Sequence, residues 1–165
     1  MKFSIGELII YGETGVCRVE DIVEKEFAGS VRPCYKLCPL YQSCTIFTPA
    51  DNENVYMRPI LSCAEAESLI EGINTLTPEA YTTSSPRELS DLYSKIIKRH
   101  DCVELVTLTL SIQKKKEKCI EQKKKFSAID ERYLKKAEDL LFGELAASLG
   151  IDKASVREYI ENKTK

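Results

Sequence analysis

The feature that most constrains the fold is the opening of the chain, where two short apolar runs flank a tight turn. Residues 8–11 and 16–19 are rich in β-branched and aromatic side chains, and the Gly-Glu-Thr-Gly segment 12–15 connects them. A third run, residues 31–40, follows the Ala-Gly-Ser segment 28–30. Strands joined by so few residues pair in an antiparallel manner. The chain is therefore expected to begin with a small twisted antiparallel sheet.

Two further apolar runs end at prolines. Residues 44–48 stop at Pro49, and residues 55–58 stop at Pro59. Proline removes a donor from the hydrogen-bond ladder, so it is found on edge strands or at the last residue of a strand. Five short strands with tight turns predict an SH3- or Tudor-like antiparallel β-barrel over residues 1–61.

The pattern changes to helical spacing at Ser62. This serine and Glu65 have the spacing of a capping box, in which each side chain satisfies a free backbone N–H group. Similar start signals recur downstream, and Gly150 is a stop signal. We expect helices from Ser62 to about Thr75, from Ser85 with Pro86 to His100, from Asp101, from Ser127 to Gly150, and from Asp152 to about Asn162. The fold class predicted is α+β, with an all-α helical bundle over residues 62–165.

Composition excludes several classes of protein. The net charge of −2 argues against a protein that coats nucleic acid through bulk charge. There is no run of roughly 18 apolar residues, so no membrane span is expected. The N-terminus lacks the apolar core and cleavage site of a signal peptide. Seven cysteines without a CxxC pair indicate reduced thiols in a cytoplasmic protein.

Catalytic and metal-binding patterns are lacking in the sequence. The single histidine, His100, is expected to be a solvated residue at a helix end. Cys34 and Cys38 would share a strand face about 13 Å apart, too far to chelate together. We therefore expect no enzyme activity, metal or cofactor, and cysteines that act as small buried hydrophobes.

Positive charge is concentrated in residues 114–125. The simplest interpretation is a solvated helix end, because Glu117 and Glu121 lie in the same stretch. Such a local basic patch also suits a phosphate backbone. A weaker basic face is predicted on the second helix, formed by Arg87, Lys95, Lys98 and Arg99.

Residues 144–162 resemble a helix-turn-helix motif, with a glycine at the turn. Its second helix is poor in base-reading groups, because acidic residues offset Lys153 and Arg157. A packing hairpin that closes the bundle is the preferred interpretation, and sequence-specific DNA binding remains the alternative.

The order Phe-x-x-Gly-x-x-x-x-Tyr-x-x-x-Gly-Val-x-x-Val over residues 3–19 resembles the start of the CarD/CdnL family of bacterial transcription regulators. The resemblance extends to Gly29, Tyr35-x-Leu37, Pro49, Arg58 and, in residues 127–146, to the penultimate helix of the family.

The resemblance implies binding to the β subunit of RNA polymerase, partly by addition of a strand to the barrel. By position, Lys25 and Phe47 fall where the family contacts polymerase, and Phe47 stands where a basic residue is common. The implied polymerase-binding residues are Lys25, Thr45, Ile46, Phe47 and Thr48.

The resemblance also implies that the helical domain touches promoter DNA and stabilises the open complex. The family carries a tryptophan at the start of the second helix, whereas this chain has none and places Pro86 near that position, followed by the single Arg87. Contacts would be to the DNA backbone, without sequence specificity, by a monomer. The expected DNA-binding residues are Pro86, Arg87, Lys95, Lys98, Arg99, Lys114, Lys115, Lys116, Lys123, Lys124 and Lys125. A protein-interaction module without a DNA role is a further alternative.

Overall fold

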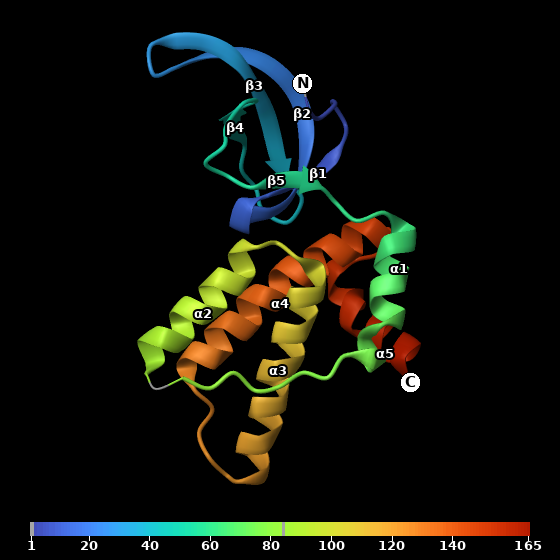
Figure 1. The fold of residues 1–165 in the computed structure, drawn as a ribbon. Coiled ribbons are helices and arrows are strands. Elements are labelled where there is room, and N and C mark those ends of the chain that lie inside the picture. Colours follow the sequence, from blue (N-terminus) through green and yellow to red (C-terminus); the bar gives the residue numbers. More distant parts are fainter. Residues whose placement is uncertain (1, 84) are drawn as a thin grey trace. The chain divides into compact units, whose positions relative to one another are not determined.

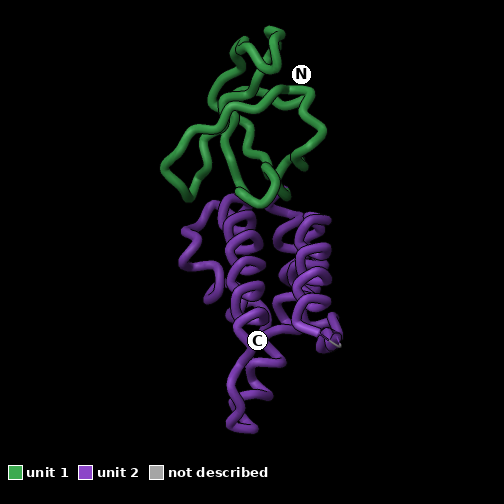
Figure 2. The backbone as a smooth tube through the Cα atoms, turned by 90° about the vertical axis from the view of Figure 1, so that its left-hand side faces the viewer, with its two compact units in different colours: residues 1–61 green, residues 62–165 purple. Residues whose placement is uncertain are grey.

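A computed structural model describes residues 2–83 and 85–165 of the chain. The backbone divides into two compact units, Met1–Leu61 and Ser62–Lys165 (Figures 1 and 2). The first unit holds the strands and the second holds the α-helices. The predicted α+β fold class is confirmed.

The first unit is one antiparallel sheet of five strands in the order β4-β3-β2-β1-β5. The sequence left each proline-terminated run as an edge strand or as a strand that ends at its proline, and both hold, because the two outer strands end at Pro49 and Pro59. Strand boundaries differ from the expectation, because β2 extends over 13 residues and the two edge strands are one residue shorter than the predicted runs. The strands are β1 (Leu8–Tyr11), β2 (Gly15–Phe27), β3 (Ser30–Pro39), β4 (Ile46–Pro49) and β5 (Met57–Pro59).

Local backbone signals explain the connections of this sheet. A single 3₁₀ turn, Gly12–Thr14, joins β1 to β2. The β2–β3 turn consists of Ala28 and Gly29, which both have positive φ, at 50° and 83°. Two successive left-handed residues define the type I′ turn that matches the twist of a hairpin. An irregularity between Val19 and Asp21 interrupts the register of these strands, and β2 is strongly curved (Figure 1).

The core of the sheet unit lies on one face of β1, β2 and β3. Its buried members are Phe3, Ile9, Cys17, Val19, Tyr35 and Leu37. The hydroxyl of Tyr35 accepts a hydrogen bond of 3.0 Å from the backbone N–H of Phe3. The chain before β1 is thereby tied to the centre of β3. The fold of this unit is Tudor-like.

Four α-helices of the helical unit begin at the residue that the sequence predicted. The side chains of Ser62, Ser85, Asp101 and Ser127 each accept the backbone N–H three residues further on. The helix α4 ends at Gly150 in the left-handed conformation, with φ 70°. The helices are α1 (Cys63–Glu71), α2 (Pro86–Lys98), α3 (Cys102–Glu121), α4 (Ala128–Leu149) and α5 (Val156–Thr164), with 3₁₀ turns at Ile73–Thr75 and Lys153–Ser155.

The expectation for His100 is wrong. The helix α2 ends at Lys98, and His100 is buried with φ 53° rather than solvated at a helix end. The chain reverses here between α2 and α3, and the histidine occupies the left-handed position of that reversal. Burial of this residue depends on tertiary packing, which its sequence position did not indicate.

The cysteines match their expected role in part. All seven are thiols outside any disulfide; Cys17, Cys34 and Cys102 are buried, whereas Cys44 and Cys63 are exposed. Within residues 2–83 and 85–165, no three His, Cys, Asp or Glu side chains are grouped so that they could hold a metal ion. In the same residues, no helix is both long and apolar enough to cross a membrane.

Candidate functional site

The outer strand β4 presents an open sheet edge. It pairs with β3 in the register Ile46↔Leu37, Phe47↔Lys36 and Thr48↔Tyr35. The N–H of Ala50 donates to the Pro33 carbonyl at 2.9 Å.

This bond fixes which backbone groups remain for a partner. Along an antiparallel pair, every second residue forms backbone hydrogen bonds with the partner strand. Because Ala50 is one of these residues, Thr48 and Ile46 also direct their N–H and C=O groups to β3. The N–H and C=O groups of Phe47 therefore point to the outer side. Pro49 has no N–H group. No strand lies beyond β4 in the part of the chain that the structure describes.

The structure brings Lys25 and Phe47 into contact. The ammonium nitrogen of Lys25 lies 3.6 Å from the centroid of the Phe47 ring. Arg32 lies opposite Lys25 in the register, and Lys36 lies opposite Phe47. Alternation of side chains places these four residues on the same face of the sheet, opposite to the core. Sequence reasoning missed Arg32 and Lys36, although their four-residue spacing on a strand was a usable signal.

The remaining residues predicted for the polymerase contact differ in accessibility. Thr45 is exposed and lies just before β4, Ile46 is half-buried, and the Thr48 side chain is buried. The Oγ1 atom of Thr48 accepts a hydrogen bond of 3.0 Å from the Asn52 amide. Thr48 can therefore serve a partner only indirectly, by holding the edge strand in place.

The basic residues of the helical unit fall into separate groups. Lys95, Lys98 and Arg99 are exposed at the C-terminal end of α2, whereas Arg87 is exposed in its first turn. The remaining exposed candidates lie at the far end of α3, a helix of 20 residues and therefore about 30 Å long. The two basic groups predicted from the sequence thus stay separate, and Arg87, in the first turn of α2, lies at the other end of that helix from Lys95, Lys98 and Arg99. This second group comprises Lys114, Lys116, Lys123, Lys124 and Lys125.

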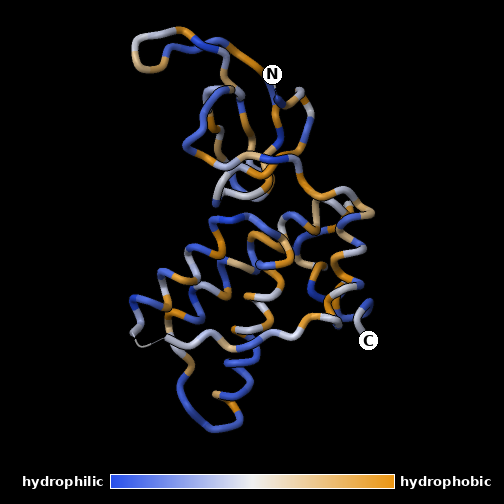
Figure 3. The backbone as a smooth tube through the Cα atoms, in the orientation of Figure 1, coloured by the Kyte–Doolittle hydropathy of each residue, from blue (hydrophilic) through white to orange (hydrophobic). Residues whose placement is uncertain are grey.

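The end of α3 and the segment that follows it extend past α2 and α4 (Figure 1) and are strongly hydrophilic (Figure 3). Arg99 at the opposite end donates to the Glu104 carboxylate at 2.9 Å, so its charge is already partnered. The far end of α3 is therefore the stronger electrostatic feature of this unit.

Lys115 differs from the lysines beside it because it forms a bridge inside the bundle. Its ammonium lies 3.2 Å from Asp130 Oδ1 on α4 and 3.2 Å from the hydroxyl of Tyr93 on α2. That hydroxyl donates to the same Asp130 oxygen at 2.6 Å. Burial and the bond to Asp130 raise the pKa of Tyr93. The three side chains join α2, α3 and α4.

Pro86 lies at the rim of a hollow of about 300 Å³ beside this bridge. Tyr81 lines the same hollow and packs edge-on against Tyr93, with ring centroids 6.1 Å apart. The proline and the tyrosine thus share one local surface at the start of α2. Lys115 lies on the wall of the hollow, with its charge turned to Asp130.

The second helix of the helix-turn-helix-like segment uses its key side chains for packing. The guanidinium of Arg157 donates to Glu138 on α4 at 2.5 Å and lies over the Phe142 ring. The hydroxyl of Tyr159 bonds to Glu67 on α1. Among the exposed residues of α5 are Glu158 and Glu161. These contacts favour the packing hairpin over a recognition helix.

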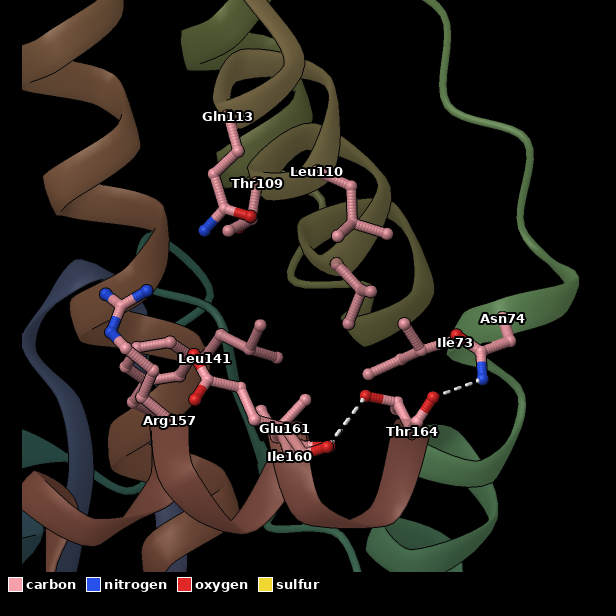
Figure 4. A pocket seen from close by; sticks show the side chains of 12 residues that line it. Ile73, Asn74, Thr109, Leu110, Gln113, Leu141, Arg157, Ile160, Glu161 and Thr164 are labelled. Atoms are coloured by element: carbon pink, nitrogen blue, oxygen red, sulfur yellow. Dashed lines mark hydrogen bonds between the residues drawn. The ribbon is translucent and has the colours of Figure 1, made fainter. Parts of the chain in front are cut away.

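A cavity of about 270 Å³ lies between α3, α4, α5 and the 3₁₀ turn 73–75 (Figure 4). Apolar side chains from these elements form most of its wall. The Asn74 amide donates to the Thr164 carbonyl at 2.8 Å, and the Thr164 hydroxyl donates to the Ile160 carbonyl at 2.8 Å. Polar groups at the rim are thus used to hold the C-terminus of α5. The cavity brings together no arrangement of groups suited to catalysis.

The unpaired edge of β4 offers backbone groups to which a strand of another chain could pair. Residues 3–61 match the family model of the CarD-like/TRCF RID domain. The sheet unit belongs to this family, which confirms the resemblance seen in the sequence for this part of the chain. The RID domain is a non-catalytic interaction domain, and its presence supports an RNA-polymerase-interacting, transcription-related protein. No curated protein matches the chain.

The family match ends at residue 61. The resemblance of residues 127–146 to the penultimate helix of the family therefore stays a prediction. The same holds for the assignment of DNA-contacting residues on the helical unit.

Proposed function

We propose that this chain binds the β subunit of RNA polymerase through the open edge of β4 and modulates promoter open-complex formation through DNA contacts of its helical unit. The observation that carries the proposal is the unpaired edge of β4 in a domain of the RID family. The protein would act as a monomer in the cytoplasm, without a cofactor.

The polymerase contact is a strand addition supported by one side-chain pair. A strand of the partner would accept hydrogen bonds from the N–H groups of Thr45 and Phe47 and donate hydrogen bonds to their carbonyl groups. Lys25 stacks on Phe47 next to this edge. The pair offers an apolar ring and a positive charge, a combination that suits a partner surface with both apolar and acidic side chains.

The DNA contact would be made through phosphates, because the exposed basic residues at the two ends of α3 suit a backbone without base reading. Pro86 and Tyr81 would meet DNA at the start of α2, where the family carries a tryptophan. Lys115 would contribute by holding α3 and α4 together, since its ammonium is bound to Asp130.

A proline substitution tests the strand addition. Thr45 is exposed and lies just before β4, outside its pairing with β3, so Thr45→Pro should remove a donor at the open edge and keep the internal ladder. We expect the full-length variant to lose capture of a purified polymerase β-lobe fragment, whereas Thr45→Ala, which keeps the N–H, should retain it. Equal capture by the two folded variants would refute the proposed edge contact.

Two alternatives predict different DNA binding. A helix-turn-helix regulator would prefer one palindromic DNA sequence and form a homodimer, and the internal contacts of Arg157 and Tyr159 speak against it. An interaction module without a DNA role would show no salt-dependent affinity for a duplex. Titration of the protein with unrelated duplexes over a salt series separates the three possibilities.

A further inference from the structure

The end of α3 departs from the usual chemistry of helix termination. The N–H of Lys124 donates to the Cys119 carbonyl at 2.8 Å, and the N–H of Lys123 donates to the Ile120 carbonyl at 3.2 Å. Lys123 has φ 54°. This pair of bonds around a left-handed residue is the Schellman ending of a helix, in which the left-handed position normally holds glycine. Here that position is lysine, and a second lysine follows it.

Helix termination alone does not require a lysine at this position. A side chain in the left-handed region is strained by contact between its Cβ and the backbone, and glycine avoids that contact. Favourable charge near the helix C-terminus is already supplied by Lys118 in the last turn. Residues that violate a local preference are concentrated where a protein has a functional use for them.

The turn after α3 is held firmly on both sides. Before it, the Lys115–Asp130 pair fastens α3 to α4. After it, Ser127 caps the first turn of α4. The Lys116 ammonium lies 5.8 Å from the centroid of the Phe126 ring, which draws the returning chain toward the helix. The Schellman hydrogen bonds of Lys123 and Lys124 fix the start of the turn, and an ordered backbone loses less conformational freedom on binding.

The charge of this turn is positive in spite of nearby acids. Lys123, Lys124 and Lys125 are exposed, and so is Lys118 one turn earlier. The carboxylates in the same stretch are Glu117 and Glu121, so the lysines exceed the acids. Lysine ammonium groups act as flexible point charges. This arrangement therefore suits a partner that carries regularly spaced negative charges.

We propose that residues 122–126 form a phosphate-binding turn for the backbone of duplex DNA, with Lys123 held in a strained conformation so that its ammonium contacts a phosphate. This inference rests on the DNA half of the proposed function and deepens it. It assigns the main backbone contact to the end of α3 rather than to α2.

The decisive variant is Lys123→Gly in the full-length chain, with Lys163→Gln as the control. Both remove one exposed positive charge from a helix end of the same unit, but only Lys123 occupies the left-handed position. We expect Lys123→Gly to raise the unfolding midpoint, because the strain is relieved. We also expect its affinity for a short duplex to fall on the order of fivefold at low salt, with a smaller slope of affinity against salt. Lys163→Gln should change neither quantity appreciably.

Three outcomes would contradict the inference in different ways. A higher unfolding midpoint for Lys123→Gly with a duplex affinity equal to that of the control would show that the turn is only a helix stop. Absence of duplex binding by the unmodified protein would refute the DNA half of the proposed function itself. A loss of binding by Lys123→Gly that is confined to single-stranded RNA or to anionic phospholipid vesicles would assign the turn to another phosphate-bearing partner and overturn the proposal.

Discussion

Lys115 shows how one lysine in a basic run acquires a structural role. Its side chain is 18% exposed and that of Asp130 is 7% exposed, whereas the neighbouring Lys114 and Lys116 are on the surface. Each of these two largely buried charges is stabilised by the other, because removal of one would leave the other as an unpaired charge with little access to water.

Substitution of one partner should therefore be costly. We expect Asp130→Asn to lower the free energy of unfolding by about 2–3 kcal/mol, because the Lys115 ammonium loses its counter-charge. Urea denaturation measures this change. The control is Asp139→Asn, which removes an acid on the same helix that is 59% exposed and pairs with Lys153, and it should cost at most about 0.5 kcal/mol. Equal losses in the two variants would contradict a structural role for Lys115.

The hydroxyl of Tyr93, which bonds to Asp130 and Lys115, makes the stability of the protein sensitive to high pH. Burial and the hydrogen bond to Asp130 raise its pKa in the folded protein above the ordinary value of about 10. The fold thus favours the protonated tyrosine, and this contribution to stability is complete below pH about 10 and is lost as the pH rises beyond it. We expect Tyr93→Phe to show a weaker loss of stability above pH about 10 than the unmodified protein, measured by urea denaturation at each pH. A loss of the same steepness would argue against this tyrosine as the source.

At the scale of the elements, the β2–β3 turn combines a favourable and an unfavourable residue. Gly29 suits its left-handed conformation, but Ala28 has φ 50° and carries a Cβ atom. Asparagine tolerates this region better than alanine and is common at the first position of a type I′ turn.

Replacement of Ala28 should therefore strengthen the hairpin. We expect Ala28→Asn to increase the free energy of unfolding by about 0.5–1 kcal/mol, measured by thermal or urea denaturation. Ala64→Asn, in the first turn of α1, serves as the control, because asparagine in a helix gives no such relief. A destabilising effect of Ala28→Asn would show that the turn does not adopt the type I′ conformation.

For the whole molecule, the proposed contacts are divided between two compact units, with β4 in the first and the end of α3 in the second. Variants in one unit should therefore affect one partner. We expect Thr45→Pro to reduce capture by the polymerase fragment and leave duplex affinity unchanged. The triple variant Lys123→Gln, Lys124→Gln and Lys125→Gln should do the reverse. The two binding assays check this separation, and a triple variant that lost polymerase capture would contradict it.

Much of the fold could be predicted from the sequence because its signals act over a few residues. The serine or aspartate that precedes each of α1, α2, α3 and α4 satisfies an N–H group three residues away, and Gly150 ends α4 through its own backbone conformation. Pro49 and Pro59 end the two edge strands, where a missing N–H donor is tolerated, but Pro33 and Pro39 lie in the inner strand β3, so a proline alone did not identify an edge. The same local order of residues carried the resemblance that the family match confirms for residues 3–61.

The candidate sites depended on contacts that local signals do not encode. The sequence determined that Lys115 is charged, but only the packing of α2, α3 and α4 decided that its charge is bound to Asp130. The sequence placed Lys25 and Phe47 far apart in the chain, and the register of three strands brought them within 3.6 Å. Local backbone hydrogen bonds set where the elements begin and end, whereas the burial and pairing of side chains are settled by elements distant in sequence.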